Sequence, residues 1–352
     1  MDRRTLFSAF YELANARGAE FKSRFKDLFA DDIVWRTVHP INTITGSDDV
    51  LETVFSPLHS SFPDLERRDL IFMRGTYEGR EYVGAVGHYC ANFKNDWLTI
   101  PATGRPVWLR YGEIYEIAGE KIINAYMLWD VLDLMRQSGF WPIAPSLGTE
   151  GMWSGPITGD GIRLDASPVD QGAASLAQTL AMHKTLADYD DHTFAGREGL
   201  LTMPQKLHWH EKMMWYGPSG IGTTRSLAGF VDYHQLPFRL AYPNRKGGSQ
   251  WDEVPEDARK TLNGGHYVRI GDGPYSLTSG WPSVYAEHSG GSILGTGGTG
   301  KVVNMRVMDF YLHHESMIRE NWVPIDIIHI LHQKGLDVFD RMQTFFRRGN
   351  PW

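Results

Sequence analysis

Apolar residues recur at helical spacing near the amino terminus and later give way to long stretches that alternate like strands. Helices are predicted over residues 3–15 and 21–29, and a strand over 32–38 follows them. Ser47 is a favoured cap for the next predicted helix, 47–60. The remaining predicted elements are strands over 66–75, 81–94, 107–117 and 121–129, and a short helix over 130–138.

This order of elements predicts the fold class. Helices followed by a long antiparallel sheet are typical of an α+β domain, and we expect a cone-shaped α+β barrel whose curved sheet wraps around the amino-terminal helices. Alternate strand residues would line its interior, a geometry that suits small apolar ligands.

The last predicted helix has a counterpart later in the chain. LWDVLDLMRQSG and VPIDIIHILHQKG share an aspartate, a glutamine and a glycine, and Asp130 lies 196 residues before Asp326. At this offset Glu113 aligns with Asp309, and further upstream an offset of 180 aligns Trp35 with Trp215. Similarity at a nearly constant offset indicates a tandem duplication.

The duplication predicts two domains, at 1–144 and 173–352. The segment 145–172 is rich in Gly, Pro and Ser and is expected to link them. Because the offset grows from 180 to 196, the second copy must contain an insertion. We predict a surface loop near 243–265, which is polar and rich in Gly.

Composition narrows the class of protein. The chain has 352 residues, more than one core usually serves, and 42% of them are hydrophobic, which excludes a disordered chain. The formal net charge is −7 and the basic residues are scattered, so no nucleic-acid partner is expected. Cys90 is the only cysteine and excludes an intrachain disulfide. With no signal-peptide pattern and no membrane-spanning apolar run, a cytoplasmic protein without membrane contact is expected.

Each copy ends its last predicted strand on an aspartate. Tyr126 shares a strand face with Asp130, as Trp322 does with Asp326. If that face lines the interior, burial raises the pKa of the carboxyl group and makes it a usable acid or base. Both aspartates also stand where a helix begins, and Asp is a favoured cap worth about 1 kcal/mol. The sequence leaves both roles open.

Other polar residues are weaker candidates for chemistry. Glu113 and Asp309 lie in the middle of strands, either as surface charges or as acids lining the interior. His208 and His210 lack an identifiable third ligand, so no metal is predicted. GTGGTGK at 295–301 lacks the Ser or Thr and the following helix of a phosphate-binding loop, so no nucleotide cofactor is predicted.

The phrases ATGRPVWLRYGEIYEI and GEKIINAYMLWDVLDLMRQSG resemble the SnoaL-like polyketide cyclases, also called predicted ester cyclases, of the nuclear-transport-factor-2-like superfamily. The family pattern is a Gly-Arg turn, a strand, a turn of the D-G-K-I type, and an aspartate before L-x-Q-x-G. GEKI at 119–122 and Asp130 match it well, whereas the second copy matches more loosely. The resemblance covers nearly all of 1–140 and two thirds of 173–340.

The resemblance implies a cofactor-free enzyme that closes a ring in a small or medium apolar, polyketide-like carbonyl compound by an intramolecular aldol reaction. It implies Asp130 first and Asp326 second as the groups that move the proton. The candidate substrate-binding residues are Trp35, His88, Tyr126, Trp215 and Trp322. His88 aligns with Val284, so the two cavities are not expected to be equivalent.

Two kinds of alternative stay open. The same scaffold hosts isomerases, dehydratases and epoxide hydrolases, because a fold does not fix the reaction. A non-catalytic small-ligand binder is the alternative from another class. A structural pseudo-dimer, in which the duplication merely fuses two protomers, belongs to the same class of alternative. A homodimer or an intramolecular pseudo-dimer is the expected assembly.

Overall fold

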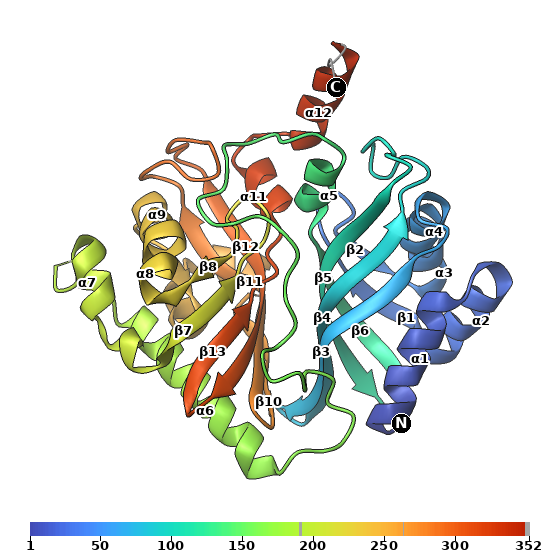
Figure 1. Cartoon of the computed structure of the whole chain (residues 1–352), viewed down its shortest axis with the longest axis horizontal. Helices are drawn as coiled ribbons and strands as arrows, with labels where there is room; N and C mark the ends of the chain where they lie inside the picture. Colours follow the sequence, from blue (N-terminus) through green and yellow to red (C-terminus); the bar gives the residue numbers. More distant parts are fainter. Residues whose placement is uncertain (190–191, 263, 349–352) are drawn as a thin grey trace. The chain divides into compact units, whose positions relative to one another are not determined.

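A computed structural model describes residues 1–189, 192–262 and 264–348 of the chain. Residue 263 of the predicted loop and residues 349–352 of the second predicted domain lie outside the described residues. Contacts divide the chain into two units (Figure 1). The first contains 1–142, 152–166 and the segment from Asp337, and the second contains 143–151 and 167–336. The domain boundaries at 144 and 173 stay a prediction.

The first unit combines helices with a 6-stranded sheet in the strand order β2-β1-β6-β5-β4-β3. Its elements are α1 Arg3–Asn15, α2 Gly18–Leu28, β1 Phe29–Arg36, β2 Thr43–Thr45, α3 Ser47–Val50, the π-helical turn η1 Leu51–Phe55, α4 Ser56–Ser61, β3 Glu66–Tyr77, β4 Arg80–Asn92, β5 Pro106–Ala118, β6 Lys121–Trp129, α5 Val131–Gln137 and α12 Val338–Arg347. Strand β1 pairs parallel with β6, and the other neighbours are antiparallel.

Aromatic side chains join the helices of the first unit to its sheet. Helices α1 to α4 lie on one side of the sheet (Figure 1). Phe10 of α1 packs on Tyr115 of β5 with 4.7 Å between ring centroids, and Phe25 of α2 stacks on Phe29 at 4.3 Å. These contacts put the core between helices and sheet, and they confirm the predicted α+β class with a curved sheet around amino-terminal helices.

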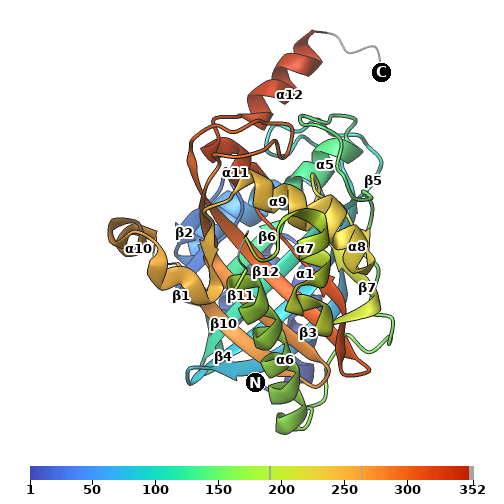
Figure 2. The same ribbon diagram turned by 90° about the vertical axis from the view of Figure 1, so that its left-hand side faces the viewer.

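The second unit repeats this arrangement, with the strand order β10-β11-β12-β13-β7-β8 and β9 paired to β11. Its elements are α6 Val169–Ala187, α7 Gly196–Thr202, the 3-10 turn η2 Pro204–Leu207, β7 Trp209–Tyr216, β8 Thr224–Arg225, α8 Ser226–Phe230, the π-helical turn η3 Val231–Gln235, α9 Leu236–Ala241, β9 Lys246–Gly247, the 3-10 helix η4 Gly248–Glu253, α10 Glu256–Leu262, β10 His266–Asp272, β11 Tyr275–Glu287, β12 Val302–His314, β13 Met317–Trp322 and α11 Ile327–Gln333. Figure 2 shows α6, α8 and α9 in front of this sheet.

The two units differ most at the edge of the sheet. Strand β3 of the first unit runs without interruption for 12 residues. In the second unit the short strand β9 and the later strand β10 replace it, and η4 and α10 lie between them. The predicted loop 243–265 therefore contains short helices as well as loop, and it interrupts the edge of the sheet.

Helix α12 belongs to the first unit although it comes last in the chain. The Phe345 ring lies 5.1 Å from that of Phe140, and Arg341 donates a hydrogen bond of 2.9 Å to the carbonyl of Pro142. None of the helices in the described part of the chain is long and apolar enough to cross a bilayer.

Candidate functional site

The interior of the first unit is filled. Its cavity measures about 30 Å³, roughly the share of one water molecule in the liquid. Phe10, Trp35 and Phe55 contribute rings to its wall, and Arg67 reaches it from the edge strand β3.

Glu113 of β5 is the buried acid of this interior, with none of its side chain exposed. Arg67 approaches it at 2.5 Å, and the hydroxyls of Tyr89 and Tyr115 donate hydrogen bonds of 2.7 and 2.9 Å to its carboxylate. A buried charge is tolerated when it is paired and hydrogen-bonded in this way. The carboxylate of Glu113 therefore has a structural role.

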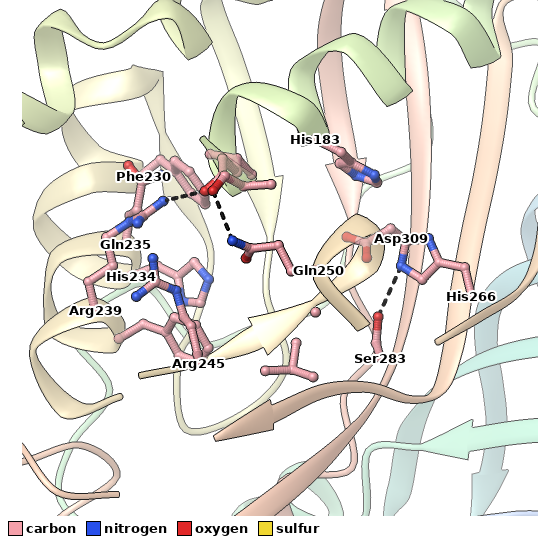
Figure 3. Close-up of a pocket in the computed structure, with 15 residues that line it drawn as sticks. His183, Phe230, His234, Gln235, Arg239, Arg245, Gln250, His266, Ser283 and Asp309 are labelled. Atoms are coloured by element: carbon pink, nitrogen blue, oxygen red, sulfur yellow. Dashed lines mark hydrogen bonds between the residues drawn. The ribbon is translucent and has the colours of Figure 1, made fainter. Parts of the chain in front are cut away.

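The second unit has a cavity of about 230 Å³ at the corresponding place (Figure 3). Helix α6, the α8–η3–α9 segment, the β9–η4 segment and strands β10, β11 and β12 surround it. Its lining residues are His183, Leu186, Ala187, Phe230, His234, Gln235, Phe238, Arg239, Arg245, Gly247, Gln250, His266, Ser283, Val284 and Asp309.

Smaller or more polar side chains open this space. Aligning α1 with α6 at an offset of 173 places His183 where the first unit has Phe10. At the offset of 180, Gln235 stands in place of Phe55. Each change replaces an aromatic hydrocarbon ring with a group that fills less apolar volume, so a hollow is left between helices and sheet.

The residue that takes the place of Arg67 does not line this cavity. Lys246 lies opposite Tyr285 in the strand register in which Arg67 lies opposite Tyr89. Lys246 forms an ion pair with Glu253 of η4, and it is not among the residues that line the cavity. The inserted segment therefore supplies a different partner for the residue that takes the place of Arg67.

Asp309 of β12 is the counterpart of Glu113 and lines this cavity. Burial raises the pKa of Asp309 from 3.8 to about 7, and hydrogen bonds from Asn321 and Tyr311 oppose that rise only in part. Its side chain is half-buried because the cavity reaches it. A carboxyl group with this pKa exchanges its proton readily at neutral pH.

Two histidines lie on the same wall as Asp309 (Figure 3). His183 Nε2 lies 2.9 Å from the hydroxyl of Tyr311, and His266 Nε2 lies 3.1 Å from that of Ser283. Burial lowers the pKa of His183 to about 4 and that of His266 to about 3. Both rings are therefore neutral at pH 7. They offer hydrogen-bonding groups to the cavity without adding positive charge.

Asp130 is placed differently. It is 8% exposed, caps α5 by accepting a hydrogen bond of 3.0 Å from the Asp133 amide, and pairs with Arg110 at 2.8 Å. Arg110 and Glu113 lie on opposite faces of β5 because they are three residues apart. Asp130 is thus held on the sheet face opposite the filled interior.

Asp326 has the same arrangement in the second unit. Its carboxylate accepts a hydrogen bond of 3.1 Å from the His329 amide and pairs with Arg306 at 3.0 Å. Asp326 is 2% exposed and does not line the cavity. The geometry of both aspartates is that of a helix cap held by an arginine, and their catalytic role stays a prediction.

The repeated glutamine and glycine complete this motif. Gln137 donates to the Trp108 carbonyl and accepts from the Trp108 amide, both at 2.9 Å. Gln333 does the same with Asn304 at 2.9 and 3.0 Å. Gly139 and Gly335 leave the helices with φ of 85° and 88°, values that glycine adopts without strain. The repeated phrase therefore docks a short helix onto the central strand of each sheet.

Trp35 is a predicted substrate-binding residue that lies in the wall of the filled interior. His88 accepts a hydrogen bond of 3.3 Å from the Trp153 amide, and burial lowers its pKa to about 4. Tyr126 lies under the guanidinium of Arg36, 4.8 Å from ring centroid to guanidinium carbon.

The two predicted tryptophans of the second unit are not among the residues that line the cavity. Trp215 stacks on His234 with 4.2 Å between centroids, and His234 lines the cavity. Trp322 stacks on Tyr216 at 5.1 Å. Among the described residues no group of three or more His, Cys, Asp and Glu side chains is arranged to hold a metal ion.

Sequence reasoning did not select His183, Gln235 or His266. It noted Asp309 but left open whether its side chain faces the interior. The signals for these residues were the insertion near 243–265 and the replacement of apolar residues of the first copy by polar ones in the second. Both can be recognised once the two copies are aligned.

Comparison with known proteins shows a similarity in the first unit. The family model described as the SnoaL-like domain matches residues 7–125. The matched part of the first unit is therefore similar to the SnoaL-like domain, and the second unit repeats the strand order of the first. The comparison with curated proteins gave no match.

Solved structures match single halves of the chain. A candidate SnoaL-like polyketide cyclase from Jannaschia sp. CCS1 is 18% identical over 38% of this chain and 87% of that one, with a TM-score of 0.31. A SnoaL-like polyketide cyclase from Agrobacterium tumefaciens is 15% identical over 39% and 98%, with a TM-score of 0.31. A protein with a ketosteroid isomerase-like fold from Catenulispora acidiphila is 17% identical over 38% and 92%, with a TM-score of 0.29.

Proposed function

We propose that the second unit is an enzyme that moves a proton at a carbon next to a carbonyl group, with Asp309 as the acid and base. The observation that carries the proposal is a carboxyl group whose pKa is raised to about 7, facing a largely apolar cavity of about 230 Å³. That volume equals roughly eight water molecules and suits a compound of one or two rings.

The reaction follows from these groups. Ionised Asp309 accepts a proton from the carbon beside a carbonyl, and the electron pair of the broken C–H bond forms an enolate. Neutral hydrogen-bonding groups of the wall, such as His183 and Ser283, can donate to the enolate oxygen. The enolate carbon then bonds to a second carbonyl carbon of the same molecule, and the resulting alkoxide takes the proton back from Asp309.

Ring closure is proposed because the SnoaL-like family includes proteins named polyketide cyclases. Return of the proton to a different carbon would instead make the protein an isomerase, with the same residues in the same roles. No cofactor takes part in the proposed proton transfers.

The first unit has a structural role in this proposal. Glu113 is paired with Arg67 and two tyrosines, and about 30 Å³ of free space cannot admit an organic ligand. One half of the duplicated chain would then carry the chemistry. The filled half would contribute stability to the chain.

The test is the exchange of the α-protons of 2-tetralone, a two-ring ketone, in D₂O, followed by NMR. The protein is expected to accelerate exchange, and Asp309→Asn to lower the rate about 10²-fold or more, the usual worth of a general base. Asp130→Asn and Asp326→Asn serve as matched controls that should keep most of the rate. An unchanged rate in Asp309→Asn, with loss in either control, would assign the chemistry to the capping aspartates instead.

A further inference from the structure

The second unit contains another cavity, of about 160 Å³. The loops around Ile221 and Ile293, the segment around Leu147, and Tyr233 and Pro237 of the η3–α9 region line it. Of the described lining residues, none is an acid, a lysine or an arginine. The chemistry of this wall suits an alkyl chain or an aryl ring.

His234 is the residue that both cavities share. Its ring stacks on Trp215, with centroids 4.2 Å apart and planes 15° from parallel, and the Phe230 ring lies 5.4 Å away. Burial lowers the pKa of His234 to about 3, so the ring is neutral at pH 7. A neutral flat ring between two hollows can act as a partition.

A larger side chain occupies the corresponding position in the first unit. At the offset of 196, Ile293 corresponds to Trp97, and each forms an isolated antiparallel bridge, Ile293 with Thr296 and Trp97 with Ile100. Trp97 is 2% exposed and packs edge-on against Phe62 and Trp129. The second copy therefore has a smaller side chain where an indole fills the first copy.

We propose that the two cavities are subsites of one ligand site, separated by the ring of His234. The ligand is an apolar carbonyl compound with an alkyl or aryl substituent, whose carbonyl end lies near Asp309 and whose tail enters the second cavity. The placement of the carbonyl end rests on the proposed function. The placement of the tail rests only on the two cavities and on their shared wall.

Entry of the tail requires His234 to leave its stack on Trp215. An aromatic stacking contact is worth less than the burial of two methylene groups, so a tail of three or more carbons outweighs its loss. Short ligands would leave the partition closed, and longer ones would open it.

The test is calorimetric titration of the full chain at pH 7 with acetophenone, butyrophenone and hexanophenone. We expect affinity to rise about fourfold per methylene that enters the second cavity, as burial in an apolar site requires. Ile293→Trp, which copies the residue of the first unit, should bring the ratio of hexanophenone to acetophenone affinity close to one. His234→Ala should raise that ratio, because it removes the partition.

Matched controls separate the outcomes. Val54 is the counterpart of His234 in the first unit, and Val54→Ala should leave the affinity ratio as it is in the parent protein. If Ile293→Trp keeps the full gain in affinity per methylene, the second subsite does not exist. The same conclusion follows if no ketone binds to any variant. Asp309→Asn is expected to keep the chain-length dependence while losing proton exchange, so failure of the proposed chemistry gives a different result.

Discussion

Arg67 and Glu113 form a buried ion pair in the first unit, with 2.5 Å between Nη1 and Oε2. The second unit keeps an acid at the aligned position, but the residue in the register of Arg67 pairs elsewhere. This change in the edge strand, together with His183 and Gln235 in place of Phe10 and Phe55, distinguishes the cavity of the second unit from the filled interior of the first.

The carboxyl group of Asp309 should titrate near pH 7. Its carbon chemical shift in ¹³C-labelled protein, assigned by comparison with Asp309→Asn, is expected to change with a midpoint about three units above the usual value of 3.8. A midpoint below 5 for Asp309 would remove the physical basis of the proposed base.

The same group should make stability depend on pH. Because the folded pKa of Asp309 is raised, the folded state binds more protons than the unfolded state between about pH 4 and 7. Its contribution is complete below pH 4 and is lost as pH rises through 7. Buried histidines such as His183 act in the opposite direction, so the measurement is the difference in the free energy of unfolding between the parent and Asp309→Asn. A difference independent of pH would contradict the assignment.

Removing Arg67 should destabilise the first unit strongly. Arg67→Met leaves Glu113 buried without its cation, and breaking a buried pair costs about 3–5 kcal/mol of the free energy of unfolding. Lys246→Met is the matched change in the second unit, and its partly exposed pair should contribute less than about 1 kcal/mol. Denaturant unfolding of both variants gives the comparison, and equal losses would contradict the difference between the interiors.

Residues of the first unit should close the cavity of the second. The double variant His183→Phe, Gln235→Phe copies Phe10 and Phe55, and it is expected to lose binding of 2-tetralone without loss of thermal stability, because apolar rings fill the hollow. Calorimetry and thermal unfolding measure both effects. Binding that persists at the parent affinity would place the ligand outside this cavity.

The docking glutamine should matter for stability. Gln137→Ala removes two hydrogen bonds to the Trp108 backbone and should cost about 1–3 kcal/mol of the free energy of unfolding, the penalty for unpaired buried polar groups. The exposed Gln171 on α6 is a control whose replacement by Ala should change stability by less than about 0.5 kcal/mol. A loss no larger than that of the control would mean that water replaces the side chain.

Local patterning was sufficient to predict much of the fold. Residues 3–15 form the helix that the spacing of Leu6 and Phe10 indicates, and the long strands follow in the expected order. The repeated Asp, Gln and Gly residues indicated the duplication. The Asp and Gly residues act within a few residues of themselves, as a helix cap and a helix end, whereas Gln137 and Gln333 dock on strand residues 29 positions earlier. Short-range physics of this kind can be recognised in a linear sequence.

The choice between acids was made only by the tertiary structure. Strand β6 is buried on both faces, so the alternation of residues could not show that Met127 faces the interior and Tyr126 the opposite side. Asp130 and Asp326 were favoured by the family resemblance, yet both are held by arginines from the neighbouring strand. The pKa of Asp309 is raised by burial, which segments distant in the chain provide, and hydrogen bonds from Asn321 and Tyr311 oppose that rise in part. The sequence therefore determined the helices and strands and their repetition. Only the folded arrangement decided which carboxyl group faces a cavity and is not paired with a cation from the edge strand.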